Sequence, residues 1–256
     1  MEEARKRAAA RGATALLEGL YEPKYAYLKQ GDVAKAWSDI LRHNKDQTPE
    51  FTLWRNRVSV RLVPKGARKV LEIGIGMGHA LQYLSKRVPD AELYGTDVTA
   101  QSVARASEQL KGHFAVADLG EVRWPGVQFD AILMLEVLEH VEVPRAFSVL
   151  RWVHSLLADK GCLILSVPLE SVADLRKTHF LCPHCGEYVH QIGHLRSYSE
   201  LQPIRMELAL SGFKLDRAQG VAGGTYLGVS RQRLMPLFPS RVKPMVMIFR
   251  CVKQGF

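Results

Sequence analysis

From Lys69 onward, short apolar segments alternate with amphipathic stretches, and this alternation constrains the fold more than any other feature of the sequence. Five segments are rich in apolar residues, and helix-like stretches separate most of them: KVLEI, AELYGTD, HFAVA, FDAILM and GCLILSV. Near-continuous apolar strands are buried on both faces, and strands that alternate with helices form parallel sheets through right-handed crossovers. The sequence therefore predicts a doubly wound α/β fold.

The flanking segments extend this architecture. A predicted helix over 199–210 is followed by two more apolar segments, GFKLDRA and MVMIFRCV, which bring the expected sheet to seven strands, most of them parallel. In the first sixty residues, apolar side chains recur at helical spacing and predict a helical N-terminal cap. We expect this cap or lid over 1–60 and the main domain over 61–256, within which 169–197 forms a lid insertion.

Composition sets the broad class of the protein. With 256 residues and a hydrophobic fraction of 47%, the chain is large enough for one enzyme-sized core. The charged N-terminus lacks an apolar region behind it, and no apolar stretch reaches the roughly 18 residues of a spanning helix. Cys162 and Cys251 fall in strand-like apolar segments, which indicates burial in a reducing compartment. We expect a cytoplasmic protein without disulfides or a transmembrane segment.

The net charge of +9 is unevenly distributed. From Lys214 to the end of the chain there are eight basic residues and one acidic residue. A basic region of this kind favours an anionic partner: a phosphorylated small molecule, a nucleic acid or an anionic membrane surface. A solvated basic surface without a partner is the alternative.

The segment VLEIGIGMGHAL is the strongest motif. A predicted strand ends before Gly74, Gly76 and Gly78, and a helix follows. Such a turn lets a ligand approach the backbone closely and contact the N–H groups at a helix N-terminus. The dinucleotide fingerprint needs a small residue where His79 stands, so it is not met. The motif therefore predicts a nucleoside-containing ligand other than a dinucleotide.

Polar residues follow the next three predicted strands. Asp97 ends the second strand, where α/β nucleotide-binding sheets hold ribose hydroxyls. Asp118 follows the third strand, and Glu136, Glu139 and His140 follow the fourth. The carboxyl ends of parallel strands meet at one edge of the sheet, so we expect these side chains to lie close together there.

The ordered set LEIGIGMG, GTD, ADL and FDAILMLEVLEHV resembles the class I S-adenosylmethionine-dependent methyltransferases, which have a Rossmann-like fold, over roughly Lys69 to Phe213. The resemblance implies S-adenosyl-L-methionine as cofactor. It implies that the methionine part of the cofactor is lined by Glu72, Gly74, Gly76 and Gly78. It also implies that Asp97 with Val98 binds the ribose and that Asp118 with Leu119 contacts the adenine. Glu136 would begin a segment flanking the cofactor.

The acceptor side is predicted from the segment HLRSYSELQPIRMELALSGFKL. It resembles the stretch after strand five in small-molecule members of the family, which carry a His, an Arg and an aromatic residue here as His194, Arg196 and Tyr198. Methyl transfer requires an aligned nucleophile and, for a hydroxyl, a general base. We take His140 as the first candidate base, with His194 and Tyr198 also facing the acceptor; helix capping or packing is the alternative role for His140.

The segment CPHCGEYVHQIGH has the spacing of a compact metal site. Its predicted Zn²⁺ ligands are Cys182, Cys185, His190 and His194, with His179 or His184 as a substitute for one imidazole. A closed four-ligand site of this zinc-knuckle type is structural. The alternatives are a redox pair, which lacks its usual strand and helix context, and a chance cluster of lid residues. As a zinc ligand, His194 cannot also accept a proton.

The acceptor class follows from weaker signals. Our leading prediction is O-methylation of a small molecule or glycan intermediate by in-line transfer. The basic C-terminal region would suit an acceptor that carries an anionic group. The alternative is N-methylation of RNA or protein through the basic C-terminal region, but the tetrad of many base N-methyltransferases is replaced by LEVL over 135–138. A non-catalytic scaffold and peripheral membrane contact are further alternatives. Trp54, Arg55 and Arg57 either close over the cofactor or pack as an ordinary helix.

Overall fold

A computed structural model describes residues 50–121, 123–170, 178–181, 188–190, 193–222, 225–227 and 245–254. Of the predicted N-terminal cap over 1–60, it includes one helix, α5 (Glu50–Arg61), whereas residues 1–49 lie outside the described part. The cap as a whole and the boundary at residue 60 therefore stay predictions.

The predicted α/β sheet is present, but it is mixed. Its strands are β1 (Lys69–Ile73), β2 (Glu92–Asp97), β3 (His113–Val116), β4 (Phe129–Leu135), β5 (Leu157–Pro168), β8 (Phe213–Ala222), β9 (Thr225–Leu227) and β10 (Val246–Lys253). Their order across the sheet is β3-β2-β1-β4-β5-β10-β8-β9. The first five run parallel, whereas β10, β8 and β9 pair antiparallel.

Four of the seven strand pairings are parallel and three are antiparallel, so the sheet is mostly parallel as expected, but it has eight strands where seven were predicted. The five strands that alternate with helices are parallel, as predicted. The chain between β8 and β9 is too short for a helical crossover, so it reverses direction and β9 adds a short eighth strand at the edge. β10 then inserts between β5 and β8.

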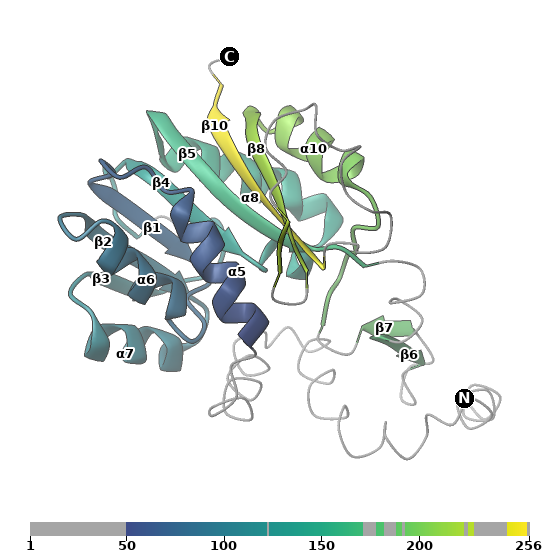
Figure 1. Cartoon of the computed structure of the whole chain (residues 1–256), viewed down its shortest axis with the longest axis horizontal. Helices are drawn as coiled ribbons and strands as arrows, with labels where there is room; N and C mark the ends of the chain where they lie inside the picture. Colours follow the sequence, from purple (N-terminus) through teal and green to yellow (C-terminus); the bar gives the residue numbers. More distant parts are fainter. Residues whose placement is uncertain are drawn as a thin grey trace.

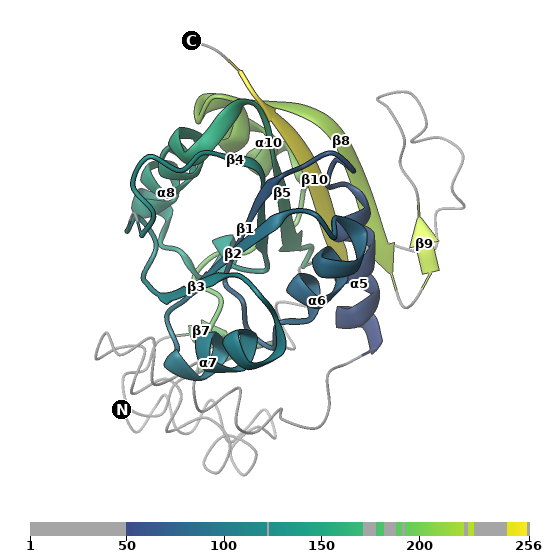
Figure 2. The ribbon, with the colours of Figure 1, turned by 90° about the vertical axis from the view of Figure 1, so that its left-hand side faces the viewer.

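Helices cover both faces of the sheet (Figures 1 and 2). They are α5, α6 (His79–Arg87) and α7 (Ala100–Gln109) on one face, and α8 (Val143–Leu156) and α10 (Leu201–Leu210) on the other. Each face has its own cluster of buried apolar side chains. Cys162 on β5 and Cys251 on β10 are buried in these clusters with free thiols, so their predicted burial is confirmed.

A separate two-stranded antiparallel sheet lies in the predicted lid insertion. It consists of β6 (His179–Leu181) and β7 (Tyr188–His190), and Figure 1 shows it apart from the main sheet. A short 3-10 helix, η1 (Leu138–His140), follows β4. None of the helices in the described ranges is long and apolar enough to span a bilayer.

Candidate active site

The turn between β1 and α6 has the backbone that its glycines predict. Gly74, Gly76 and Gly78 have left-handed φ angles of 81°, 52° and 78°, which residues with a Cβ adopt only at a cost. At Gly74 an added Cβ would also lie 2.6 Å from Cγ2 of Val137. Because α6 begins directly after Gly78, its first N–H groups, which have no carbonyl partner within the helix, lie at the carboxyl edge of the sheet. This edge can therefore receive a ligand against bare backbone.

Glu72 lies in β1, just before this turn, and is only 3% exposed. Its Oε2 atom is buried and has no hydrogen-bond partner among the described residues. Burial raises the pKa of Glu72 to about 8; the positive charge of Arg55 lowers it in part, and the negative charge of Asp97 raises it further. A buried carboxyl group without a described partner at Oε2 fits a ligand that presents a cationic N–H donor, such as the amino group of methionine, because a neighbouring cation favours the ionised carboxylate.

Asp97, at the end of β2, is fixed by three hydrogen bonds. Its Oδ2 accepts from the backbone N–H of Gly76 at 2.9 Å, and its Oδ1 accepts from the N–H and the hydroxyl of Thr99 at 2.9 and 2.8 Å. The carboxylate is therefore tied to the glycine turn. A carboxylate has about four acceptor positions, so one remains for a ribose hydroxyl. Val98 is half-buried beside it.

Asp118 and Leu119 follow β3, at the position that the sequence predicts. The half-exposed carboxylate of Asp118 lies 3.1 Å from a guanidinium nitrogen of Arg145 in α8. The same guanidinium donates to the carbonyl oxygen of Leu119 at 2.7 Å. Arg145 therefore holds this loop, and contact of Asp118 and Leu119 with an adenine stays a prediction.

Glu136, directly after β4, has a strained backbone. Its φ of 55° is the one positive value among the non-glycine residues that the structure describes. Its backbone N–H lies 3.1 Å from Oγ of Ser166 in β5, and the Ser166 hydroxyl donates to Oε1 of Glu136 at 2.7 Å. Arg55 of α5 lies 3.5 Å from its Oε2. A strained residue held from several sides at a sheet edge is typical of a functional site.

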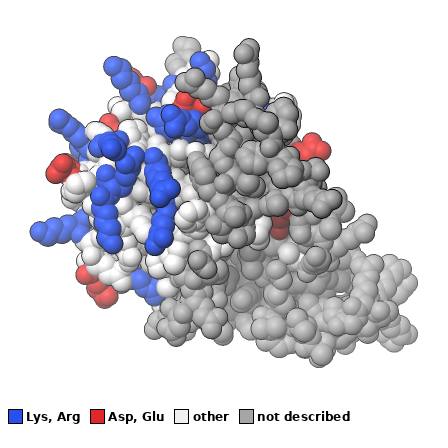
Figure 3. Space-filling model, in the orientation of Figure 1, with Lys and Arg blue, Asp and Glu red and all other residues white. Residues whose placement is uncertain are grey.

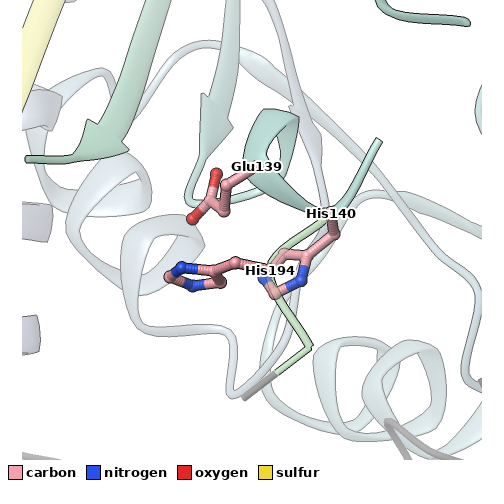
Figure 4. Close-up of side chains that lie close together, drawn as sticks. All are labelled: Glu139, His140 and His194. Carbon is pink, nitrogen blue, oxygen red and sulfur yellow. The ribbon is translucent and has the colours of Figure 1, made fainter. Parts of the chain in front are cut away.

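His140, at the end of η1, is the predicted base. Its Nδ1 lies 3.1 Å from the carbonyl oxygen of Gly193. Because a carbonyl only accepts, Nδ1 carries the proton and Nε2 is the acceptor nitrogen. Burial is the main reason that the pKa of His140 falls to about 3, and the neighbouring His194 lowers it further. The ring is therefore neutral near pH 7 but a weak base. Figure 4 shows it beside His194 and Glu139.

Arg196 and Tyr198 contact α10. Tyr198 is 3% exposed, and its hydroxyl lies against the guanidinium of Arg196 and 3.2 Å from a carboxylate oxygen of Glu207. Arg196 also forms an ion pair with Glu207. These contacts attach the segment after β7 to α10, and a role for Tyr198 at the acceptor stays a prediction.

His190 and His194 lie together, as the predicted metal site requires. Their shared partner is Glu170, which follows β5 and is not among the predicted ligands. A single Glu twenty residues before His190 gives no spacing signal. The other two predicted ligands, Cys182 and Cys185, lie outside the described residues, so the four-ligand site stays a prediction.

A profile of the methyltransferase domain family matches residues 35–216. The chain belongs to this family. The predicted membership of a methyltransferase family is therefore confirmed. The match spans the glycine turn, the acids that follow the parallel strands and the segment up to β8.

Among curated proteins, the demethylmenaquinone methyltransferase of Thermotoga maritima is 30% identical over 115 residues, which are 44% of this methyltransferase and 49% of that enzyme. The chain thus spans about half the length of the curated relative it matches. Among solved structures, the N-methyltransferase NodS of Bradyrhizobium japonicum, in complex with S-adenosyl-L-homocysteine, has a TM-score of 0.59 at 16% identity, covering 87% of this chain and 98% of its own. Magnesium protoporphyrin IX methyltransferase of Synechocystis, also with S-adenosylhomocysteine, has a TM-score of 0.60 at 17% identity, covering 90% and 100%. These structures share the fold.

Basic side chains are unevenly distributed on the described surface of the methyltransferase. Figure 3 shows Lys and Arg gathered on the part of the face where α5 and α6 lie. In the basic C-terminal region, Arg250 pairs with Asp216, and Lys253 donates to the carbonyl oxygen of Leu157 at 2.8 Å. These two residues therefore stabilise the packing of β10. Residues 228–244, which hold Arg231, Arg233, Arg241 and Lys243, are outside the described ranges.

Proposed function

We propose that this methyltransferase uses S-adenosyl-L-methionine as methyl donor and transfers the methyl group to a hydroxyl of a small molecule or glycan. The observation that carries the proposal is the buried Oε2 of Glu72 beside the glycine turn, which has no hydrogen-bond partner in the described part of the chain. It fits the amino group of the donor. The two related folds that contain S-adenosylhomocysteine support this choice of donor.

The residues at the carboxyl edge hold and orient the donor. When bound, S-adenosylmethionine supplies a methyl group that is already activated by its sulfonium. Glu72 accepts a hydrogen bond at Oε2, Asp97 holds the ribose hydroxyls, and the glycine turn lets the backbone approach the ligand. The protein then gains rate mainly by fixing the acceptor in line with the methyl group, since alignment of two reactants replaces a bimolecular encounter.

The acceptor hydroxyl loses its proton to His140. Gly193 holds Nδ1 of the ring, so Nε2 is the nitrogen that accepts the proton. The ring of His194 meets that of His140 edge-on, with centroids 5.0 Å apart, and limits its rotation. We assign the role of general base to His140 and not to Tyr198, because the Tyr198 hydroxyl already contacts Arg196 and Glu207.

A structural Zn²⁺ ion in the segment after β5 is part of the proposal. His190 and His194, two of the four predicted ligands, have side chains that lie together and are 1% and 6% exposed. Such an ion would fix the predicted lid over 169–197 beside the acceptor. The sequence predicts Cys182 and Cys185 as the remaining ligands. Glu170, which contacts both histidines, is the alternative ligand.

The second candidate function is N-methylation of RNA or protein, and the basic face over α5 and α6 favours it (Figure 3). To separate the two, purified enzyme with labelled S-adenosylmethionine is incubated with metabolite, glycan, RNA and protein pools. We expect label on a small molecule or glycan, in an alkali-stable ether. Label on RNA or protein, with binding that weakens steeply as salt rises, would replace the first proposal by the second. A folded protein that does not bind the donor in calorimetry would refute both.

A further inference from the structure

Three side chains from separate segments converge beside the carboxyl end of β5. Nε2 of His190 lies 2.8 Å from Oε1 of Glu170, and Nδ1 of His194 lies 3.3 Å from Oε2 of Glu170. One ligand atom from each residue lies within 4.8 Å of the other two. The side chains are 9%, 1% and 6% exposed for Glu170, His190 and His194. Two imidazoles and one carboxylate thus share a buried volume.

The spacing of these atoms fits neighbouring ligands of one metal ion. Transition-metal ions bind imidazole nitrogen and carboxylate oxygen at about 2.0–2.2 Å, which places adjacent ligand atoms about 3.0–3.4 Å apart at tetrahedral or octahedral angles. The two observed N···O distances, 2.8 and 3.3 Å, are close to this range. The rings of His190 and His194 are nearly parallel, with centroids 4.1 Å apart. Each ring directs one nitrogen toward the carboxylate of Glu170.

The electrostatics of the cluster also favour a cation. Glu139 lies beside His194 (Figure 4), and neither of its carboxylate oxygens has a hydrogen-bond partner among the described residues. A divalent cation would offset the negative charge of the buried Glu170 carboxylate.

We propose that Glu170, His190 and His194 bind one divalent transition-metal ion of the Zn²⁺ type through two imidazole nitrogens and a carboxylate oxygen, with water completing the coordination. Glu170 takes the place that the sequence pattern assigned to cysteine. Ser197 donates to Oε2 of Glu170 at 2.8 Å and orients this ligand. The ion joins the end of β5 to the segment that carries Gly193, and so fixes the carbonyl that holds His140. The proposal does not rest on the methyl-transfer function.

Two other arrangements compete with this one. The same three residues and Ser197 can form a hydrogen-bonded network without an ion, in which Glu170 accepts every bond. Alternatively, His190 and His194 bind zinc together with Cys182 and Cys185, without Glu170. Metal content separates the first alternative from our proposal, and the chemical type of the ligand atoms separates the second.

The test uses the full chain, free of affinity tag and treated with a chelator. It is titrated with Zn²⁺ by calorimetry and with Co²⁺ by absorption spectroscopy. We expect one ion per chain and visible Co²⁺ bands without the near-ultraviolet charge-transfer band that a thiolate ligand gives. Glu170→Gln, which keeps the shape and the hydrogen-bonding oxygen, should bind the ion at least about tenfold more weakly. The same loss is expected for His190→Gln.

The matched controls are Glu108→Gln and His113→Gln, which change the same residue types at exposed positions and should bind as the wild type does. Cys182→Ser should also retain the wild-type affinity. A folded wild type that binds no ion would overturn the proposal, as would a thiolate band or a Glu170→Gln variant with undiminished affinity. If circular dichroism shows that a variant does not fold, the stoichiometry and spectrum of the wild type still decide.

Discussion

Glu72 offers the sharpest test of the cofactor site, because its charge state must change when a cationic ligand arrives. Burial raises the pKa of Glu72 from 4.5 to about 8 in the ligand-free protein. At pH 7 the carboxyl is therefore mostly protonated, with about one molecule in ten ionised. The ammonium of the donor pairs with the ionised form. Binding should then release a proton, and affinity should rise about tenfold per pH unit from pH 6 to 7.

The same shift fixes the sign of the pH dependence of stability. Between pH 4.5 and about 8, folded Glu72 holds a proton that the unfolded chain has lost. The contribution of Glu72 to stability is therefore fully present below pH 4.5 and falls as the pH rises toward 8. The expected slope is about 1.4 kcal/mol of unfolding free energy per pH unit from this one group.

Calorimetry in buffers of different ionisation enthalpy measures both the affinity and the number of protons released. Glu72→Gln is the matched variant, because it keeps the shape and an acceptor oxygen but cannot ionise. Its affinity for the donor should be lower than that of the wild type and should not change with pH. Its unfolding free energy should lack the part of the pH dependence that Glu72 contributes. An affinity of the wild type that is constant from pH 6 to 7, without proton release, would refute this reasoning.

Three further substitutions test the site. His140→Ala should lower kcat by about 10²- to 10⁴-fold for an oxygen acceptor and leave the donor affinity unchanged; an equally active variant would remove His140 from the mechanism. Gly74→Ala should lower the unfolding free energy by about 1–3 kcal/mol more than Gly126→Ala. Both glycines have a positive φ, but only at Gly74 would an added Cβ lie against Val137. Equal losses of unfolding free energy in urea titrations would contradict this clash. Ser166→Ala should lower the unfolding free energy by about 1 kcal/mol and weaken donor binding, because Ser166 holds Glu136. Ser155→Ala on α8 should leave donor binding unchanged. Equal donor affinities of the two variants would contradict this role of Ser166.

The parallel half of the fold was predictable because each local signal there agrees with the others. Apolar strands, helix-like stretches and a glycine turn alternate in order, so β1 to β5 form where the sequence predicts them. The antiparallel half was less predictable. β10 inserts between β5 and β8, and nothing in the residues of β10 specifies which strands it pairs with.

The same limit applies within the site. Gly74, Glu72 and Asp97 were found from positions relative to one strand end. Glu170 was missed because its partners lie twenty or more residues away, and the path of the chain after β5 brings them together. Ser166 was missed because a serine inside a buried strand gives no signal until β4 and β5 are placed side by side.

Arg55 connects these observations, because one cation from α5 acts on several buried acids at once. It lies 3.5 Å from Glu136, and its charge lowers the pKa of both Glu72 and Glu139 against the effect of burial. Since the side chain of Arg55 is only 13% exposed, this interaction is weakly screened by solvent. α5 is therefore more than a cover for the sheet. By holding Arg55 at the carboxyl edge, it lets Glu72 ionise more readily than burial alone would allow, which favours the binding of a cationic donor.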